Sequence, residues 1–185
     1  LPDGGATFAT EDGGWIYVSN SEIDKKMGGT GALRFNSEGT VINAYSILKN
    51  TSRNCSGGTT PWQTWLSCEE IERGYVWECD PFGKNKAQVR PELGCFRHEA
   101  IAFDVNSNKL YLTEDQPDGC LYRFTSYEMM DSGHVSLDEG FLEVAEVVVS
   151  GHAKIIRWHR LPDPSAAAIE TRKQVKHCTQ FNGGE

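Results

Sequence analysis

Three short segments of the chain repeat one pattern: an aromatic residue, an aliphatic residue, a hydroxyl residue and then a polar residue. They are YVSN at 17–20, WLSC at 65–68 and YLTE at 111–114, with aromatic residues 48 and 46 positions apart. A period of about 40 to 50 residues built from short strands is typical of a β-propeller, in which each blade is a four-stranded sheet. The pattern therefore predicts an all-β fold with about three blades.

Further strand patterns follow each repeat, and turn residues such as Asp12-Gly13-Gly14 separate them. The one stretch with helical character is 165–175, which has Pro164 before its start. Apart from that stretch the chain is predicted to be β throughout. We expect strands over 31–35, 41–48, 75–79, 99–104, 120–126 and 141–149.

These elements group into one partial β-propeller domain over 1–185. Propellers close with about four to eight blades, because an open arc leaves apolar blade faces exposed. We therefore expect a partial-length fragment, with the remaining half of the propeller in the same natural polypeptide. Its blades are expected near 8–50, 60–105 and 108–150, with an irregular connection at 151–180 and the start of the next blade at 181–185.

Charge narrows the choice of partners. The chain has 26 acidic and 18 basic residues, a net charge of -8, and no run of Lys or Arg. This balance disfavours nucleic acid and favours cations. The longest apolar run, at 144–150, is far shorter than the roughly 20 residues of a membrane helix, so no membrane span is expected in this segment.

Six cysteines and two N-glycosylation sequons, at Asn50 and Asn54, indicate an exported protein, either extracellular or periplasmic. The cysteine spacing matches no zinc signature. Cys68 and Cys79 flank a tight turn and could pair as a disulfide across a hairpin, although spacing leaves the connectivity open.

Candidate chemistry is concentrated in residues 54–70, NCSGGTTPWQTWLSCEE. A glycine-broken loop carries Cys55, and a Trp-rich strand ends at Glu69 and Glu70. A thiolate suits a transition metal, while carboxylates suit iron, manganese or calcium. The alternative is that Cys55 is half of a disulfide and both glutamates are surface charges.

Acidic residues follow the repeated strand in every copy. Equivalent strands of a propeller line one channel, so these acids are expected to converge, and like charges held together need cations. We therefore predict a metal cluster at the channel mouth. The acids are Glu22, then Glu69 and Glu70, then Glu114 and Asp115.

His98 and Glu99 form a further candidate pair within an otherwise apolar segment. Adjacent side chains on a strand point to opposite faces, so only one of the two need face the channel. A carboxylate in such a strand needs a partner, which favours Glu99 as the ligand and His98 as a structural residue. The sequence contains no GxSxG, P-loop or HExxH motif that would indicate a different chemistry.

Several long motifs resemble the PhoX-type alkaline phosphatases and their wider propeller family. They are the segment 54–70 already described, WECDPFG at 77–83, LGCFRHEAIAFD at 93–104, LYLTEDQPDGCLYRF at 110–124 and FNGGE at 181–185. The resemblance implies a six-bladed propeller, export from the cytoplasm, and a cluster of ferric iron (Fe3+) and calcium (Ca2+) that hydrolyses phosphate monoesters.

The same resemblance implies roles for individual residues. Cys55 matches an iron-binding cysteine, and Glu99 matches an iron-bridging or iron-binding glutamate. Glu70, Glu114 and Asp115 match acidic positions associated with calcium or with the outer part of the cluster. The arginine that holds the phosphate in the family is expected beyond residue 185.

Two departures from the family pattern bear on activity. The first repeat commonly contains Asn-His-Glu, whereas this chain has Asn20-Ser21-Glu22, and only 27 residues separate Glu70 from His98 in place of a long insertion. The main hypothesis is a secreted, metal-dependent phosphatase. The alternatives are a non-catalytic extracellular structural or adhesive propeller module that binds calcium, and a lactonase or esterase propeller with a single calcium.

Overall fold

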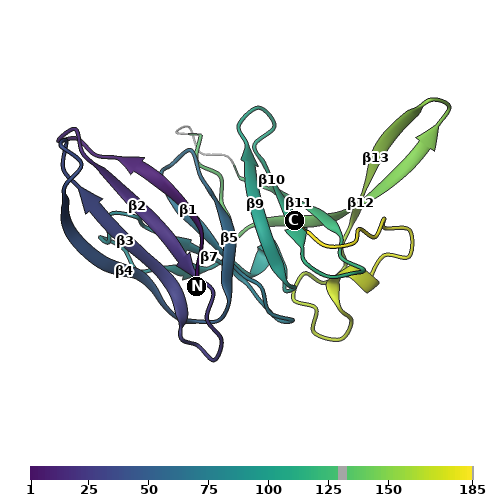
Figure 1. Ribbon diagram of the computed structural model, residues 1–185. Coiled ribbons are helices and arrows are strands. Elements are labelled where there is room, and N and C mark those ends of the chain that lie inside the picture. Colours follow the sequence, from purple (N-terminus) through teal and green to yellow (C-terminus); the bar gives the residue numbers. More distant parts are fainter. Residues whose placement is uncertain (129–132, 185) are drawn as a thin grey trace.

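The computed structural model describes residues 1–128 and 133–184 as three antiparallel sheets that follow one another along the chain (Figure 1). The first sheet contains β1 (Pro2–Ala9), β2 (Trp15–Ser21), β3 (Gly28–Phe35) and β4 (Val41–Thr51). The second contains β5 (Asn54–Thr59), β6 (Trp65–Glu69), β7 (Val76–Cys79) and β8 (Gln88–Val89). The third contains β9 (His98–Asp104), β10 (Lys109–Glu114), β11 (Leu121–Ser126), β12 (Gly140–Ser150) and β13 (Ala153–Arg160).

The three repeated sequence segments occupy the same place in the three sheets. They form β2, β6 and β10, each of which is the second strand of its sheet and pairs with the strands before and after it. The apolar residue of each pattern, Val18, Leu66 or Leu112, is fully buried. The prediction of an all-β chain is therefore confirmed, because the repeated alternation does mark strands that bury one face.

Two hydrophobic clusters form the core. One packs the second sheet against the third around Leu66, Leu110 and Tyr122, and the other packs the first sheet against the second around Ile16 and Trp65. Trp62 and Trp77 pack against the edges of these clusters, as expected of packing residues. Each sheet is thus held mainly by its neighbour in sequence.

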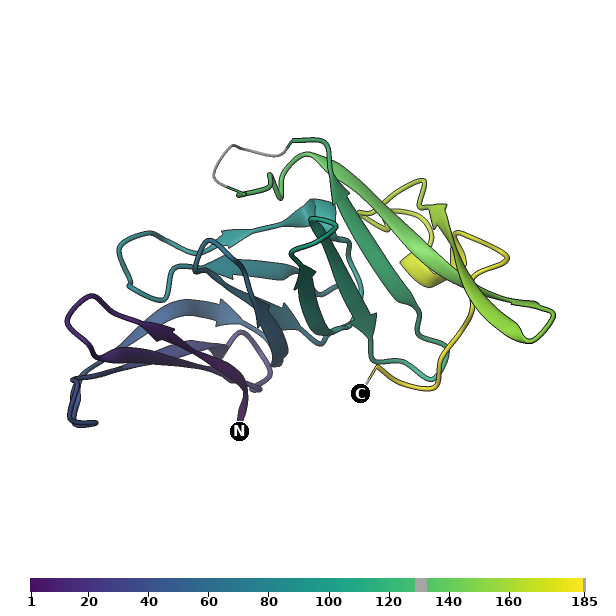
Figure 2. The same ribbon diagram turned by 90° about the horizontal axis from the view of Figure 1, so that it is seen from above.

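The first strands of the three sheets run side by side, with β5 between β1 and β9 (Figures 1 and 2). Glycine permits this close approach. A Cβ at Gly4 would lie 2.7 Å from the Cα of Ser56, and one at Gly58 would lie 2.0 Å from the carbonyl oxygen of Ile101. These distances are too short for any side chain, so the glycines are required where the strands meet.

Several expectations about the elements were wrong. Residues 54–59 form a strand and no loop, and residues 98–104 pair with β10, so they belong to the third sheet and not to a blade at 60–105. The connection expected at 151–180 contains β13, which pairs with β12 along its whole length. The expected blade at 108–150 includes residues 129–132, and the expected blade start at 181–185 includes residue 185. These residues lie outside the described part of the chain.

The expected helix at 165–175 is absent, and only a short 3-10 turn occurs, at Thr171–Lys173. The Asp163 carboxylate accepts the N–H groups of Ser165 and Ala167 at 3.0 and 2.9 Å, and Ala166 has a φ of 50°. These local bonds replace helical ones. In the described part of the chain no helix is long and apolar enough to cross a membrane.

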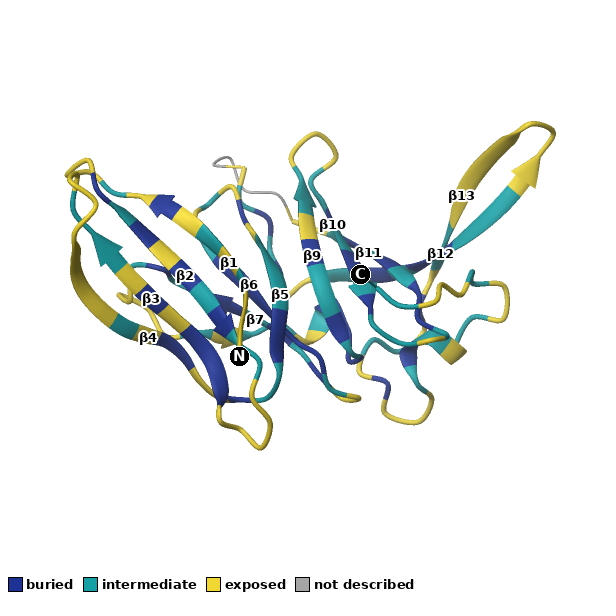
Figure 3. Ribbon diagram, viewed as in Figure 1, coloured by how far each residue is buried: buried dark blue, intermediate teal, exposed yellow. Residues whose placement is uncertain are grey.

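The β12–β13 hairpin projects from the third sheet, and its outer part is exposed (Figure 3). The structure contains six cysteines, all drawn without a disulfide bond. The expected facing of Cys68 and Cys79 was wrong, because Cys68 lies opposite Val76 and Cys79 lies opposite Trp65 in the β6–β7 pair.

Candidate metal centre

The pairing of the first and second strands is interrupted at the same place in every sheet. Two residues of the first strand lie opposite one residue of the second, which is the arrangement of a β-bulge. The bulged pairs are Asp3 and Gly4 opposite Asn20, Cys55 and Ser56 opposite Cys68, and Glu99 and Ala100 opposite Thr113. Bulges redirect side chains, so the sheets aim Asp3, Cys55 and Glu99 in an equivalent way.

A second repeated contact fixes the acid that follows each second strand. Its N–H donates to the carbonyl of the residue just before the first strand of the sheet. The distances are 2.9 Å from Glu22 to Leu1, 2.9 Å from Glu70 to Arg53 and 3.1 Å from Asp115 to Arg97. Each sheet therefore contributes one bulge residue and one acid to a common surface, named here the site face: Asp3, Glu22, Cys55, Glu70, Glu99 and Asp115.

Three residues of the site face come together closely. The ligand atoms of Cys55, Glu70 and Glu99 all lie within 4.8 Å of one another, and the Sγ of Cys55 is 3.4 Å from both carboxylate oxygens of Glu99. The sequence-based ligands Cys55, Glu70 and Glu99 thus meet although they lie up to 44 positions apart. Their convergence depends on the side-by-side packing of β5 and β9.

The electrostatics of this cluster favour a cation. Burial raises the pKa of the Glu99 carboxyl, and the charges of Glu70 and Asp115 raise it further. Burial also raises the pKa of Glu70 and of the Cys55 thiol, and the neighbouring Glu99 charge adds to the rise at Cys55. Acidic groups gathered in this way repel one another unless a multivalent cation neutralises them.

A buried amide positions the cysteine. The Nδ2 of Asn20 donates to the carbonyls of Cys55 and Ser56, each at 2.9 Å. Its Oδ1 accepts from the hydroxyl of Thr30 at 2.7 Å and from the indole N–H of Trp65 at 3.0 Å. Asn20 therefore satisfies the carbonyls that the bulge leaves unpaired and holds Cys55 in place.

Glu114 lies away from the cluster. Its Oε2 accepts from the hydroxyl of Tyr122 at 2.6 Å and from the N–H of Cys120 at 3.2 Å, and its Oε1 pairs with Arg172 at 3.2 Å. In the strand register Glu114 corresponds to Glu69, whose carboxylate also binds protein donors. Glu114 was expected to converge with the other strand-end acids, but in the structure its carboxylate lies apart from Cys55, Glu70 and Glu99.

Four strand-end residues form what we name the packed face, because their side chains are buried: Asn54, Glu69, His98 and Glu114. The His98 ring stacks on Phe96, and burial lowers its pKa to about 3. His98 and Glu99 thus separate as expected, with the histidine in the interior.

The asparagines of the two N-glycosylation sequons differ in burial. Asn54 is fully buried, and its amide bonds the hydroxyls of Thr51 and Ser67 at 2.6 and 2.9 Å. The folded chain has no room for a glycan there, so the expectation for Asn54 was wrong. Asn50 is exposed at the end of β4.

Glu22 and Asp115 lie at the margin of the cluster. Glu22 pairs with Arg53 at 3.2 Å, and the Oδ1 of Asp115 accepts the N–H of Gly184 at 3.3 Å. Both charges act on Glu70. They lie in an outer position relative to Cys55, Glu70 and Glu99.

Sequence reasoning missed two arginines and one aspartate at this surface. Arg53 and Arg97 flank Glu70, with nitrogen to oxygen distances of 3.9 and 3.5 Å. The Nε of Arg97 is buried without a hydrogen-bond partner among the described residues. The charge of Asp3 acts on both Cys55 and Glu99. These residues could have been found from their place in the repeat. The start of the first strand is equivalent in the three sheets: Leu1-Pro2-Asp3, Arg53-Asn54-Cys55 and Arg97-His98-Glu99.

The donor set fits the metals that the sequence suggests. One thiol accompanies two carboxylates in the close cluster, with further carboxylates beside it, so soft and hard ligands meet at one place. The acids have few protein donors on this side, unlike those of the packed face. A transition metal next to a harder cation matches this arrangement.

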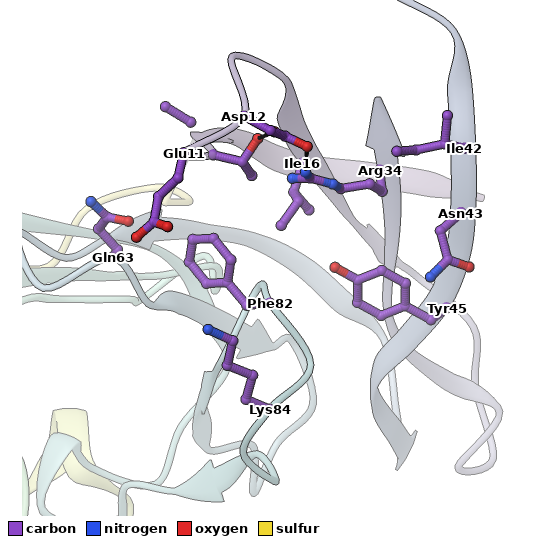
Figure 4. A pocket seen from close by; sticks show the side chains of 12 residues that line it. Glu11, Asp12, Ile16, Arg34, Ile42, Asn43, Tyr45, Gln63, Phe82 and Lys84 are labelled. Carbon is purple, nitrogen blue, oxygen red and sulfur yellow. Dashed lines mark hydrogen bonds and ion pairs between the residues drawn. The ribbon is translucent and has the colours of Figure 1, made fainter. Parts of the chain in front are cut away.

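A separate cleft of about 1000 Å³ lies on the outer side of the first sheet and the loop around Phe82 (Figure 4). Some of its polar groups are paired: Arg34 binds Asp12, and the hydroxyl of Tyr45 donates to the carbonyl of Pro81 at 2.7 Å. No residue of the site face lines it.

Comparison with known proteins agrees with the motifs. The family model described as "Alkaline phosphatase PhoX" matches residues 3–74 and 71–183, which is nearly all of the chain. Searches of curated proteins and of solved structures found no match. The chain therefore belongs to the PhoX alkaline phosphatase family.

Proposed function

We propose that this chain forms part of an exported phosphatase that hydrolyses phosphate monoesters with an Fe3+ and Ca2+ cluster at the site face. The observation that carries the proposal is the meeting of Cys55, Glu70 and Glu99 within 4.8 Å in a chain of the PhoX family. A thiol with two carboxylates is a ligand set and not a nucleophile with its base, because no histidine lies in the cluster.

Each side chain has a definite part in this proposal. Cys55 and Glu99 hold the transition metal, because thiolate is the softest ligand present and Glu99 is in contact with it. Glu70 lies between this pair and the outer carboxylates Glu22 and Asp115, which suit calcium. When bound, the cations neutralise the phosphoryl oxygens and make an oxygen nucleophile available at neutral pH.

Arg53 and Arg97 hold the substrate. Both guanidinium groups are about one third exposed and lie beside Glu70, so each can turn an N–H group towards a phosphate oxygen. These residues add to the phosphate-binding arginine that we expect beyond residue 185.

The proposed architecture is a six-bladed propeller, of which the three sheets are consecutive blades. The side-by-side order of β1, β5 and β9 supports it, since innermost strands of neighbouring blades lie next to one another around a channel. The end of the chain continues the series: a Cβ at Gly184 would lie 3.1 Å from the Cβ of Glu99. The sequence 181–185 then begins the next blade.

The test combines metal analysis with turnover in the full-length protein. Elemental analysis is expected to find iron and calcium, and phosphate release from p-nitrophenyl phosphate is expected to stop after chelation and return when both metals are restored. Cys55→Ser is expected to lose iron and activity together. Cys79→Ser is the control, because Cys79 is a buried thiol of the same sheet outside the cluster.

A protein without iron and without turnover would sink the phosphatase proposal. If calcium were then bound without turnover, the non-catalytic extracellular module would be the better description. Turnover of a lactone or carboxylic ester with calcium alone would favour the lactonase or esterase alternative.

A further inference from the structure

A pair of thiols lies outside the site face. The Sγ atoms of Cys120, just before β11, and Cys178, in the C-terminal segment, are 3.6 Å apart although the residues are 58 positions apart in sequence. Cys120 is 3% exposed and Cys178 is partly buried against the core of the third sheet. Neither belongs to the metal cluster.

The backbone around these thiols is already docked. The N–H of Thr179 donates to Ala145 at 2.9 Å, and Phe181 pairs with Gly119 through a 2.8 Å bond. The N–H of Gly183 donates to Gln116 at 3.0 Å. The two segments therefore approach one another independently of any covalent bond, which makes the sulfur contact a property of the fold.

We propose that Cys120 and Cys178 form a disulfide in the exported protein and that this bond clasps residues 178–184 to the loop at 115–120. The sulfurs need to move only about 1.5 Å closer to reach the disulfide length of about 2.05 Å. The other end of the clasped segment lies at the site face, where Gly184 donates to Asp115. The disulfide thus fixes the wall beside Asp115 and Glu99.

The reaction is thiol–disulfide exchange with an external disulfide, either a disulfide oxidoreductase or oxidised glutathione. Each cysteine loses one proton, the two sulfurs lose two electrons, and the external disulfide is reduced to two thiols through a mixed disulfide. Because Cys120 is buried in the folded chain, the exchange takes place during folding in an oxidising compartment.

Peptide mapping tests the bond directly. The full-length protein is folded with a glutathione redox pair, unfolded in denaturant so that its buried free thiols can be alkylated, and digested with trypsin without reductant. The expected product joins the peptide 110–123 to the peptide that starts at His177, while Cys68, Cys79 and Cys95 carry the alkylating group. Alkylation of both Cys120 and Cys178, or pairing of either with another cysteine, would overturn the proposal.

Thermal melting gives a second, independent measurement. Reduction is expected to lower the Tm of the wild type by roughly 5 to 10 °C, because the bond closes a long loop. Cys178→Ser, whose side chain is only partly buried, is expected to melt like the reduced wild type and to show no response to reductant. Equal melting of oxidised and reduced wild type would contradict a stabilising clasp. None of these readouts depends on phosphatase activity.

Discussion

The site face and the packed face come from the same strand ends and carry similar residues, but their surroundings differ. Among the residues that the structure describes, the donors nearest to the Glu70 carboxylate are the two arginines, at 3.5 and 3.9 Å, whereas Glu114 binds a hydroxyl, a backbone N–H and a guanidinium group. One carboxylate lacks close partners and the other has its partners within the protein. The comparison shows that an acid whose carboxylate is filled by buried protein donors, as Glu114 is, is a poorer metal-ligand candidate than one such as Glu70, whose partners are long and partly exposed.

The bulges explain why neighbouring residues divide in this way. Glu99 belongs to a bulge and faces the cluster, while His98, one position earlier, is fully buried beneath Phe96. The β5 strand repeats this division with Cys55 and Asn54. A variant on each face should therefore change a different property of the protein.

The largest effect is expected from Glu114→Gln on the packed face. Asp118 and Glu170 still pair with Arg172 in this variant, but the buried bonds of the Glu114 carboxylate to Tyr122, Cys120 and Arg172 lose their charge, which should lower the free energy of unfolding by about 2 to 3 kcal/mol. Urea denaturation measures the loss. The control is Glu146→Gln, which removes a half-buried pair with His159. It should lower the free energy of unfolding by less than about 1 kcal/mol, as expected for an exposed ion pair. If Glu114→Gln kept the wild-type stability but lost bound metal, Glu114 would be a metal ligand.

Glu70→Gln on the site face is expected to do the opposite. Phosphate release should fall by about 100-fold or more, because a metal ligand is lost. The metal-free variant should melt at or above the wild-type temperature, because burial and like charges disfavour the ionised carboxylate. Glu72→Gln, two positions away and exposed, is the control. A metal-free variant that is clearly less stable than the wild type would show that Glu70 is a packing residue.

The pH dependence of stability tests His98. Burial holds its folded pKa at about 3, below an unfolded value of about 6.5, so the unfolded chain binds the extra proton. Above pH 6.5 the buried neutral His98 does not lower the free energy of unfolding. As the pH falls from 6.5 towards 3 this free energy decreases, and the loss is about 2 kcal/mol by pH 5. Denaturation of wild type and His98→Gln across this range should show a shallower slope in the variant. An equal change in slope with the exposed His177→Gln would rule out this assignment.

The smallest effect is expected from Arg97→Lys. A lysine keeps the charge but loses the planar fork of donors, so kcat/KM for a phosphate monoester should fall by about 10-fold with an unchanged Tm. The control is Arg157→Lys on the exposed hairpin. Steady-state kinetics that are identical for both variants would remove Arg97 from substrate binding.

Local pattern was enough for most strands and for the cluster's members. The repeats at 17–20, 65–68 and 111–114 are β2, β6 and β10, because alternation records which side chains are buried. Cys55, Glu70 and Glu99 were recognisable by ligand chemistry and by family motif. The family itself followed from the same residues.

Tertiary structure decided what local pattern cannot express. The glycine-rich segments that became β1 and β5 have few side chains to alternate, and their strand character depends on backbones that approach across sheets at Gly4 and Gly58. Whether Glu70 or Glu114 is free to bind a metal depends on donors such as Arg172, 58 positions away in the chain. The sequence by itself determined most strands, the family and the ligand types, and only the folded chain decided which acids face one another, because facing is set by bulges and by contacts between distant segments.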